Sequence, residues 1–197
     1  MLSSYAFAQL ETKYKEQSTK HLGQGLFAVY RSLSYHRVLP NTFLKGCTKM
    51  RIALASDHAG YAEKEQLKPL LKDLGIDFED LGTASNDSVD YPQYARKVAE
   101  KVSHGEVEQG LLVCGSGTGM AIAANKVPGV RAAVAWTPEI ARLAREHNDA
   151  NVLSVGARVT PIEDIQQIVR AWFDAEFAGG RHARRVEEIS KIEQECK

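Results

Sequence analysis

The sequence has few cysteines and no long apolar run, and both absences exclude classes of protein. Its three cysteines, Cys47, Cys114 and Cys196, lie far apart and form no CxxC pair. This spacing argues against a zinc site or other metal site and against a disulfide framework, and it favours a reducing compartment. No run of about 18 apolar residues is present, so we expect no membrane-spanning helix.

The chain also lacks net charge. Its 25 Lys and Arg residues balance its 25 Asp and Glu residues, so no overall field attracts nucleic acid or an acidic membrane, and we predict neither as a partner. The 197 residues, of which 44% are hydrophobic, are enough for one α/β domain with a sizeable core.

Residues 1–49 have no clear apolar period and hold seven Lys and Arg against two Glu. We interpret them as a non-core N-terminal extension and a candidate disordered segment. They are alternatively a stretch translated upstream of a true start at Met50, an organelle transit peptide or a functional appendage. The amino terminus lacks the pattern of a secretory signal, so we predict a cytoplasmic protein, with organelle targeting by residues 1–49 as the alternative.

From Met50 onward, short apolar runs alternate with segments of helical spacing, which predicts βαβ units. This pattern indicates one domain over residues 50–197, built on a single doubly wound, Rossmann-like parallel sheet with helices on both faces. Ligands bind at the carboxyl ends of such strands, which directs attention to loops 56–60, 114–119 and 147–151. The expected strands are 51–56, 78–81, 110–115, 130–134 and 151–155, and the expected helices are 61–74, 91–102, 120–126, 138–146, 162–177 and 186–195.

The most informative segment is LLVCGSGTGMAIAANK, in which Gly115, Gly117 and Gly119 alternate with Ser116 and Thr118. Glycines let backbone N–H groups turn inward, and the following helix adds partial positive charge, so the segment predicts an anion cradle. The alternative is a tight strand-to-helix turn without a ligand. The segment contains neither a G-x-G-x-x-G/A nor a GxxxxGK[ST] pattern, which argues against a nucleotide cofactor.

Cys114 ends the predicted strand directly before this loop. Converging N–H groups favour a thiolate, which acts as a general base or as a nucleophile. A small residue packed in the core is the alternative for Cys114 alone. With His147 as its base, a nucleophilic Cys114 would make a thiol hydrolase or transferase.

Six motifs follow one another along residues 50–197: DHAG (57–60), DYP (90–92), CGSGTGMAIAANK (114–126), HND (147–149), GAR (156–158) and GGRHARRV (179–186). They stand in the order found in the ribose-5-phosphate isomerase B family, which the chain resembles over these residues. The resemblance implies interconversion of D-ribose 5-phosphate and D-ribulose 5-phosphate through an enediolate, without a metal or nucleotide cofactor. The wider family includes allose-6-phosphate and galactose-6-phosphate isomerases, so a hexose 6-phosphate is an alternative substrate, and a non-catalytic sugar-phosphate sensor is a further alternative.

The resemblance implies that Cys114 is the base that moves a proton between C1 and C2. The N–H groups of residues 115–119 and the Ser116 hydroxyl would stabilise the enediolate. Some relatives carry a glutamate base where this chain has Met120, which cannot accept a proton. His147 resembles the residue that opens the furanose ring, a task that suits an imidazole; alternatively it stabilises the last turn of its helix.

The remaining implied roles concern substrate contacts. Asn148 resembles a sugar contact, and Asp57 and His58 resemble a substrate-binding pair, although Asp57 alone could cap a helix. The implied phosphate ligands are Arg158, Arg181 and Arg185, whose alternative is a solvated surface charge run.

We expect His182 to be solvated, and we assign no role to Arg131, Arg142 and Arg145. The resemblance also implies an obligate homodimer, or a dimer of dimers, in which the His147–Asn148 loop faces the cysteine loop of the partner.

Overall fold

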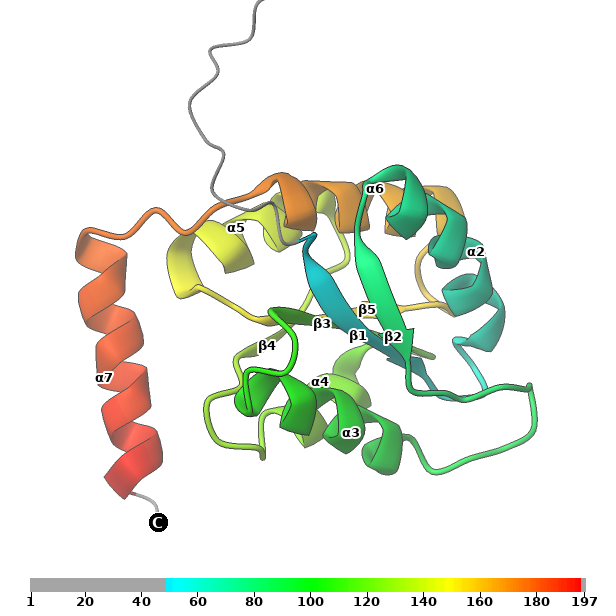
Figure 1. The fold of residues 1–197 in the computed structure, drawn as a ribbon, viewed down its shortest axis with the longest axis horizontal. Helices are drawn as coiled ribbons and strands as arrows, with labels where there is room; N and C mark the ends of the chain where they lie inside the picture. The colour runs from blue at the N-terminus through cyan, green and yellow to red at the C-terminus, as the bar shows by residue number, and fades with distance from the viewer. Residues whose placement is uncertain (1–48, 196–197) are drawn as a thin grey trace, which may run out of the picture. The chain divides into compact units, whose positions relative to one another are not determined.

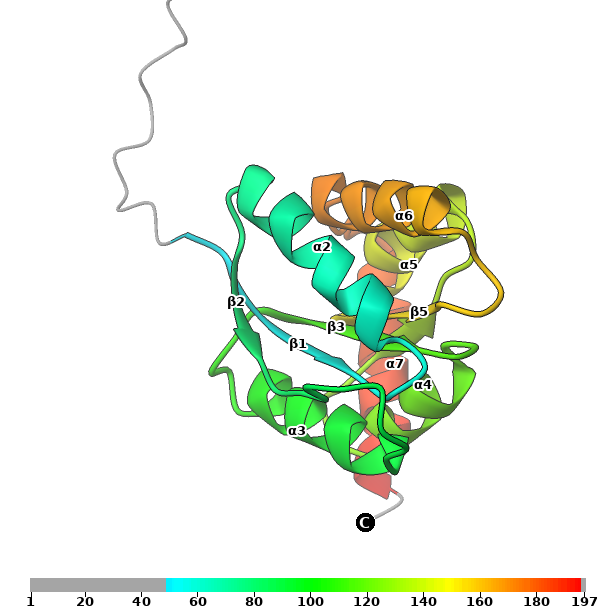
Figure 2. The same ribbon diagram turned by 90° about the vertical axis from the view of Figure 1, so that its right-hand side faces the viewer.

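A five-stranded, all-parallel sheet runs through the computed structural model, which describes residues 49–195 (Figures 1 and 2). The strand order is β2-β1-β3-β5-β4, so the predicted doubly wound α/β class is confirmed. The predictions for residues 1–48 lie outside the described residues. The strands are β1 (Arg51–Ser56), β2 (Asp77–Asp80), β3 (Gln109–Cys114), β4 (Ala132–Val134) and β5 (Val152–Gly156).

Helices cover both faces of the sheet, because the central strands are apolar on both sides. Leu111 of β3 packs in one core cluster with Leu67 and Ile165, whereas the next residue, Leu112, packs in the other cluster with Val98. This alternation follows from the period of a strand. One face carries α2 (Tyr61–Asp73), α5 (Pro138–Asn148) and α6 (Ile162–Asp174), and the other carries α3 (Tyr91–Ser103) and α4 (Thr118–Ala124).

The last helix, α7 (Arg181–Glu195), lies beyond the β4 edge of the sheet and has no buried residue (Figure 1). Its Glu193 carboxylate accepts a hydrogen bond from the Gly129 N–H group at 2.9 Å. Ile189 and Ile192 are exposed by 45% and 60%. The helix therefore presents apolar side chains that the described part of this chain does not cover.

Two predicted helix boundaries differ from the structure by three residues or more. The helix expected at 186–195 begins at Arg181, because Gly179 and Gly180, both at positive φ, turn the chain directly into its first turn. The helix expected at 162–177 ends at Asp174, since Ala175 is already extended. Within residues 49–195, no helix is long and apolar enough to cross a membrane.

An ion pair between the buried Lys64 and the partly exposed Asp80 fixes the backbone beneath the carboxyl edge of β1. Lys64 of α2 has a 1% exposed side chain, and its ammonium group donates to both carboxylate oxygens of Asp80, at 2.7 and 2.8 Å, and to the Thr83 carbonyl, at 2.7 Å. Burial raises the pKa of Asp80, but hydrogen bonds from Lys64, Lys68 and a backbone N–H group outweigh it, so the pKa is lowered overall. Because Thr83 N–H donates to the Ser56 carbonyl, this pair also holds the end of β1 in place.

Candidate active site

A pocket of about 320 Å³ opens at the carboxyl edge of the sheet, where ligands of doubly wound folds bind. It brings together side chains and backbone from the ends of β1, β3 and β5 and from the start of α3. Seven of the predicted site residues line it. They are Asp57, His58, Cys114, Gly115, Ser116, Gly119 and Arg158, and the wall is completed by Ala59, Tyr91 and Val159.

The Cys114 thiol lies at the base of the glycine loop. Cys114 is 4% exposed and pairs with Gly156 in the sheet, and its Sγ accepts a hydrogen bond from the Gly117 N–H group at 3.1 Å. Gly117 has φ +81°, and its carbonyl accepts a 2.6 Å hydrogen bond from the buried Ser154 hydroxyl. The loop thus folds back over the sulfur and directs an N–H group at it.

Arg158 connects the end of β5 to the same loop. Its backbone N–H group donates to the Gly115 carbonyl at 2.9 Å, and a Cβ atom added to Gly115 would lie 3.3 Å from the Arg158 Cδ. Glycine at position 115 therefore lets the arginine side chain pass close over the backbone. This places a guanidinium, which suits phosphate oxygens, at the wall of the thiol pocket.

Asp57 and His58 reach the pocket from the turn after β1. The Asp57 Oδ1 accepts hydrogen bonds from the N–H groups of Ala59 and Gly60, at 2.9 and 3.0 Å, so the carboxylate shapes this turn as well as lining the pocket. The His58 Nδ1 accepts from the Val89 N–H group at 3.3 Å. The neutral imidazole therefore carries its proton on Nε2.

Tyr91 is a pocket residue to which the sequence reasoning assigned no role. It is the first residue of α3 and is 41% exposed. A Cβ atom added to Gly119 would lie 2.8 Å from its ring, so the ring packs directly on the glycine loop. This tyrosine belongs to the DYP motif, but the sequence alone does not distinguish a pocket residue from a residue on the core face of α3.

The other predicted residues gather around the end of α5 and the start of α7. The rings of His147 and His182 stack with centroids 4.2 Å apart and 3° between their planes, a contact that the sequence did not predict, and His182 remains partly exposed. Partial burial and the nearby charges of His147, Arg181 and Arg185 lower the pKa of His182. The early start of α7 places both arginines on its first two turns. Asn148 is exposed at the end of α5.

These two groups of residues lie at opposite edges of the sheet. Loop 147–151 was expected at the carboxyl edge, but it follows α5 and precedes β5, so it lies at the amino edge. Cys114 pairs with Gly156 at the far end of β5. A five-residue strand separates the edges by about 16 Å, at about 3.3 Å a residue. Within one chain, His147 is therefore not a wall of the Cys114 pocket.

The family model described as Ribose/Galactose Isomerase matches residues 52–189. The chain belongs to this family. Ribose-5-phosphate isomerase B of Escherichia coli strain K12 is 47% identical over 144 residues, which are 73% of this chain and 97% of that protein. Among solved structures of the ribose/galactose isomerase family, the ribose-5-phosphate isomerase B of Clostridium thermocellum has 49% identity and a TM-score of 0.74, covering 75% of this chain and all of its own.

A second solved relative carries a ligand. It is the ribose-5-phosphate isomerase B of Mycoplasma genitalium with bound ribulose-5-phosphate, which has 39% identity and a TM-score of 0.71 and covers 74% of this chain and 97% of its own.

In residues 49–195 of the present chain, no cluster of three or more His, Cys, Asp or Glu side chains is arranged to hold a metal ion.

We predict that Gly117→Ala lowers turnover at least about tenfold, because a Cβ atom there would lie 3.1 Å from the Val155 carbonyl carbon and displace the N–H group from Cys114. Gly105→Ala is the matched control, since Gly105 also has positive φ but no neighbour within 4 Å of the added atom. The positive φ alone should cost each variant about 1 kcal/mol of unfolding free energy, and Gly117→Ala should lose more because of its close backbone contact. Thermal unfolding and steady-state rates test this, and equal turnover of the two variants would contradict a role for the Gly117 N–H group.

Proposed function

We propose that this chain is an aldose–ketose isomerase that interconverts D-ribose 5-phosphate and D-ribulose 5-phosphate. The observation that carries the proposal is the Cys114 thiol held by the Gly117 N–H group in a pocket at the carboxyl edge of the sheet. The ribulose-5-phosphate bound by the Mycoplasma genitalium relative supports the substrate class. The reaction moves a proton between neighbouring carbons of one molecule, so no step requires a nucleotide or a metal.

In the proposed mechanism, the Cys114 thiolate removes the proton from C2 of the open-chain aldose and returns it to C1 of the enediolate. The N–H groups of residues 115–119, with the Ser116 hydroxyl, would stabilise the charge on the enediolate oxygen. Met120 is a completely buried residue of α4 and has no group that accepts a proton. These features support a cysteine as the base in this chain.

We propose further that the active site is shared between two chains of a homodimer. His147 lies at the amino edge of its own sheet, so it reaches a Cys114 pocket only in a second copy. The exposed Ile189 and Ile192 of α7 supply apolar surface for such an association. A pair of dimers would leave each shared site unchanged.

The same arrangement assigns the substrate contacts. His147 would protonate the ring oxygen as the C1–O bond of the furanose breaks, and Asn148 would contact the sugar. Arg181 and Arg185, at the start of α7, lie near His182, the residue that stacks on His147 of α5. They would therefore approach the phosphate from the partner, while Arg158 approaches it from the Cys114 side.

Cys114→Ala should lower kcat for ribose 5-phosphate by about 10²–10⁴-fold while leaving sugar-phosphate binding nearly unchanged, because only the proton-transfer group is lost. Cys47→Ala is the control for loss of a thiol outside the six motifs. Allose 6-phosphate, assayed side by side with ribose 5-phosphate, tests the hexose alternative. Both assays contain a chelator, so that turnover that depends on a metal ion would be detected as a loss of activity. Near-normal turnover by Cys114→Ala would rule out the thiol as the base, and a faster rate with allose 6-phosphate would change the proposed substrate.

We also propose that residues 50–197 form the isomerase domain, which is cytoplasmic. The family match begins at Ile52, after the aperiodic N-terminal segment. A chain that starts at Met50 should keep the turnover and melting temperature of the full chain, measured at matched concentrations. Loss of either would show that residues 1–49 belong to the fold or to an interface. Fusion of residues 1–49 to a fluorescent protein tests the organelle-targeting alternative.

A further inference from the structure

The turn that carries His147 and Asn148 has an unusual backbone. The helix α5 ends at Asn148, and the next residue, Asp149, has φ 45° and ψ 42°. Among residues 49–195, Asp149 alone has positive φ without being a glycine. A left-handed residue with a side chain costs about 1 kcal/mol or more. A helix end also leaves carbonyl groups without N–H partners. The N–H groups of Asp149 and Ala150 close the helix onto the carbonyls of Arg145 and Ala144, at 3.1 Å each, but the carbonyls of Asn148 and Asp149 need donors from elsewhere.

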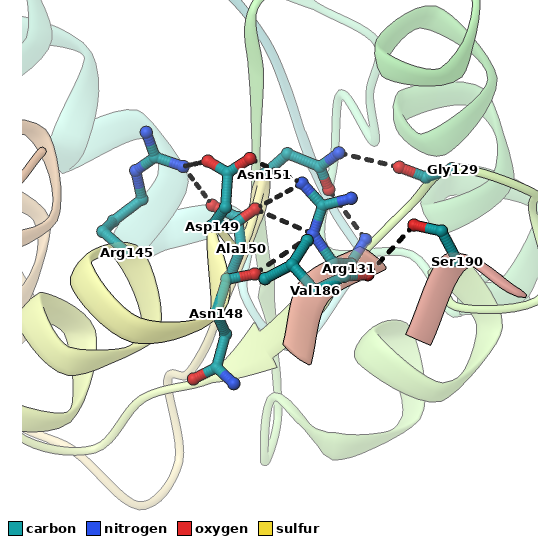
Figure 3. A network of polar contacts seen from close by, with 9 residues as sticks. All are labelled: Gly129, Arg131, Arg145, Asn148, Asp149, Ala150, Asn151, Val186 and Ser190. Atoms are coloured by element: carbon teal, nitrogen blue, oxygen red, sulfur yellow. Dashed lines mark hydrogen bonds and ion pairs between the residues drawn. The ribbon is translucent and has the colours of Figure 1, made fainter. Parts of the chain in front are cut away.

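Arg131 supplies the missing donors (Figure 3). Its Nε donates to the carbonyl oxygens of Asn148 and Asp149, at 3.1 and 2.9 Å, and its second guanidinium nitrogen donates to the Asp149 carbonyl at 2.7 Å. That nitrogen also donates to the Asp149 carboxylate at 2.9 Å. A positive charge at the end of a helix is favourable in addition. One side chain thus binds the backbone of the two residues that follow His147.

The backbone of Arg131 is anchored to the start of β5, and a second arginine binds the far side of the turn. The backbone N–H group of Arg131 donates to the Asn151 side-chain oxygen at 2.8 Å, and the side-chain amide of Asn151 donates to the Gly129 carbonyl at 2.8 Å. On the far side of the turn, Arg145 donates to the Asp149 carboxylate at 3.1 Å and to the Ala150 carbonyl at 2.6 Å. Asp149 therefore lies between two guanidinium groups, with Arg131 on the side of the exposed Asn148 (Figure 3).

We propose that Arg131 is a positioning residue for ring opening. It acts by fixing the end of α5, so that His147 is presented to the substrate in the orientation that proton transfer to the ring oxygen requires. The inference rests on the proposed ring-opening role of His147. Arg131 does not line the Cys114 pocket of its own chain, and it contacts main-chain atoms of the turn rather than the imidazole. A lysine cannot replace it fully, since a single ammonium group lacks the planar fork that spans these acceptors.

The test separates ring opening from proton transfer between carbons. Conversion of ribose 5-phosphate starts from a furanose, in which the C1–O4 bond must break as O4 gains a proton and O1 loses one. Ribulose 5-phosphate has its carbonyl at C2 and its phosphate on O5, so it cannot form a furanose. In deuterium oxide, Cys114 can remove a proton from C1 of this ketose and return a deuteron there without any ring step. The ratio of C1 exchange to ribose 5-phosphate conversion therefore reports on ring opening.

Arg131→Ala should lower conversion about 10- to 100-fold, as expected for a misplaced catalytic group. Exchange at C1 should stay within about threefold of the wild-type rate, since Cys114 is untouched. His147→Ala should raise the same ratio, and adding Arg131→Ala to it should change conversion by less than about threefold, because both variants remove one function. Arg131→Lys should fall between Arg131→Ala and the wild type. It replaces Arg131→Ala if that variant does not fold.

Arg96→Ala is the matched control and should leave both rates unchanged, because the one ion pair of Arg96 within residues 49–195 is with Glu100 on the exposed side of α3. If conversion and exchange fall by the same factor in Arg131→Ala, or if neither falls, Arg131 does not act through ring opening and the inference is wrong. If His147→Ala itself lowers both rates equally, the proposed role of His147 fails, and the inference fails with it. The two failures are distinguished by which variant loses the raised ratio.

Discussion

A parallel sheet has all of its carboxyl ends at one edge, and this constraint determines how the site can be assembled. Cys114 ends β3 at that edge, while His147 ends a helix that runs back to the opposite edge. No movement of side chains brings two such residues together, because a whole strand separates them. In the proposed mechanism, Cys114 and His147 therefore meet only between two chains. On this account, assembly is a condition of turnover and not merely a source of stability.

The constraint also gives a purpose to charged residues that lie away from the thiol pocket. Lys64 and Asp80 hold the end of β1 from beneath, where Asp57 and His58 begin. Arg131 and Arg145 hold the turn that carries His147 and Asn148. Each set fixes the backbone at one of the two edges. A site divided between subunits depends on such supports, because each half must already be in position when the chains associate.

Most of the fold could be predicted from the sequence, and about half of the site. Buried strands and amphipathic helices each have a local pattern of apolar residues, so the order of these elements along the chain could be predicted. The residues after β1 and β3 were grouped correctly, because each follows its own strand directly. Loop 147–151 was misplaced although the expected order, with helix 138–146 before it and strand 151–155 after it, already puts it at the amino edge of the sheet. The His147–His182 stack and the Arg131–Asp149 pair join residues 35 and 18 positions apart, and no local pattern reveals them.

The shared site is tested most directly by mixing two inactive variants. Cys114→Ala and His147→Ala are unfolded together and refolded, and random pairing makes about half of the dimers mixed. A mixed dimer carries both substitutions in one site and leaves the other site intact. The account predicts that activity returns to about a quarter of the wild-type value, while each variant refolded alone stays inactive. No recovery, with mixed dimers verified by mass, would contradict a site built from two chains.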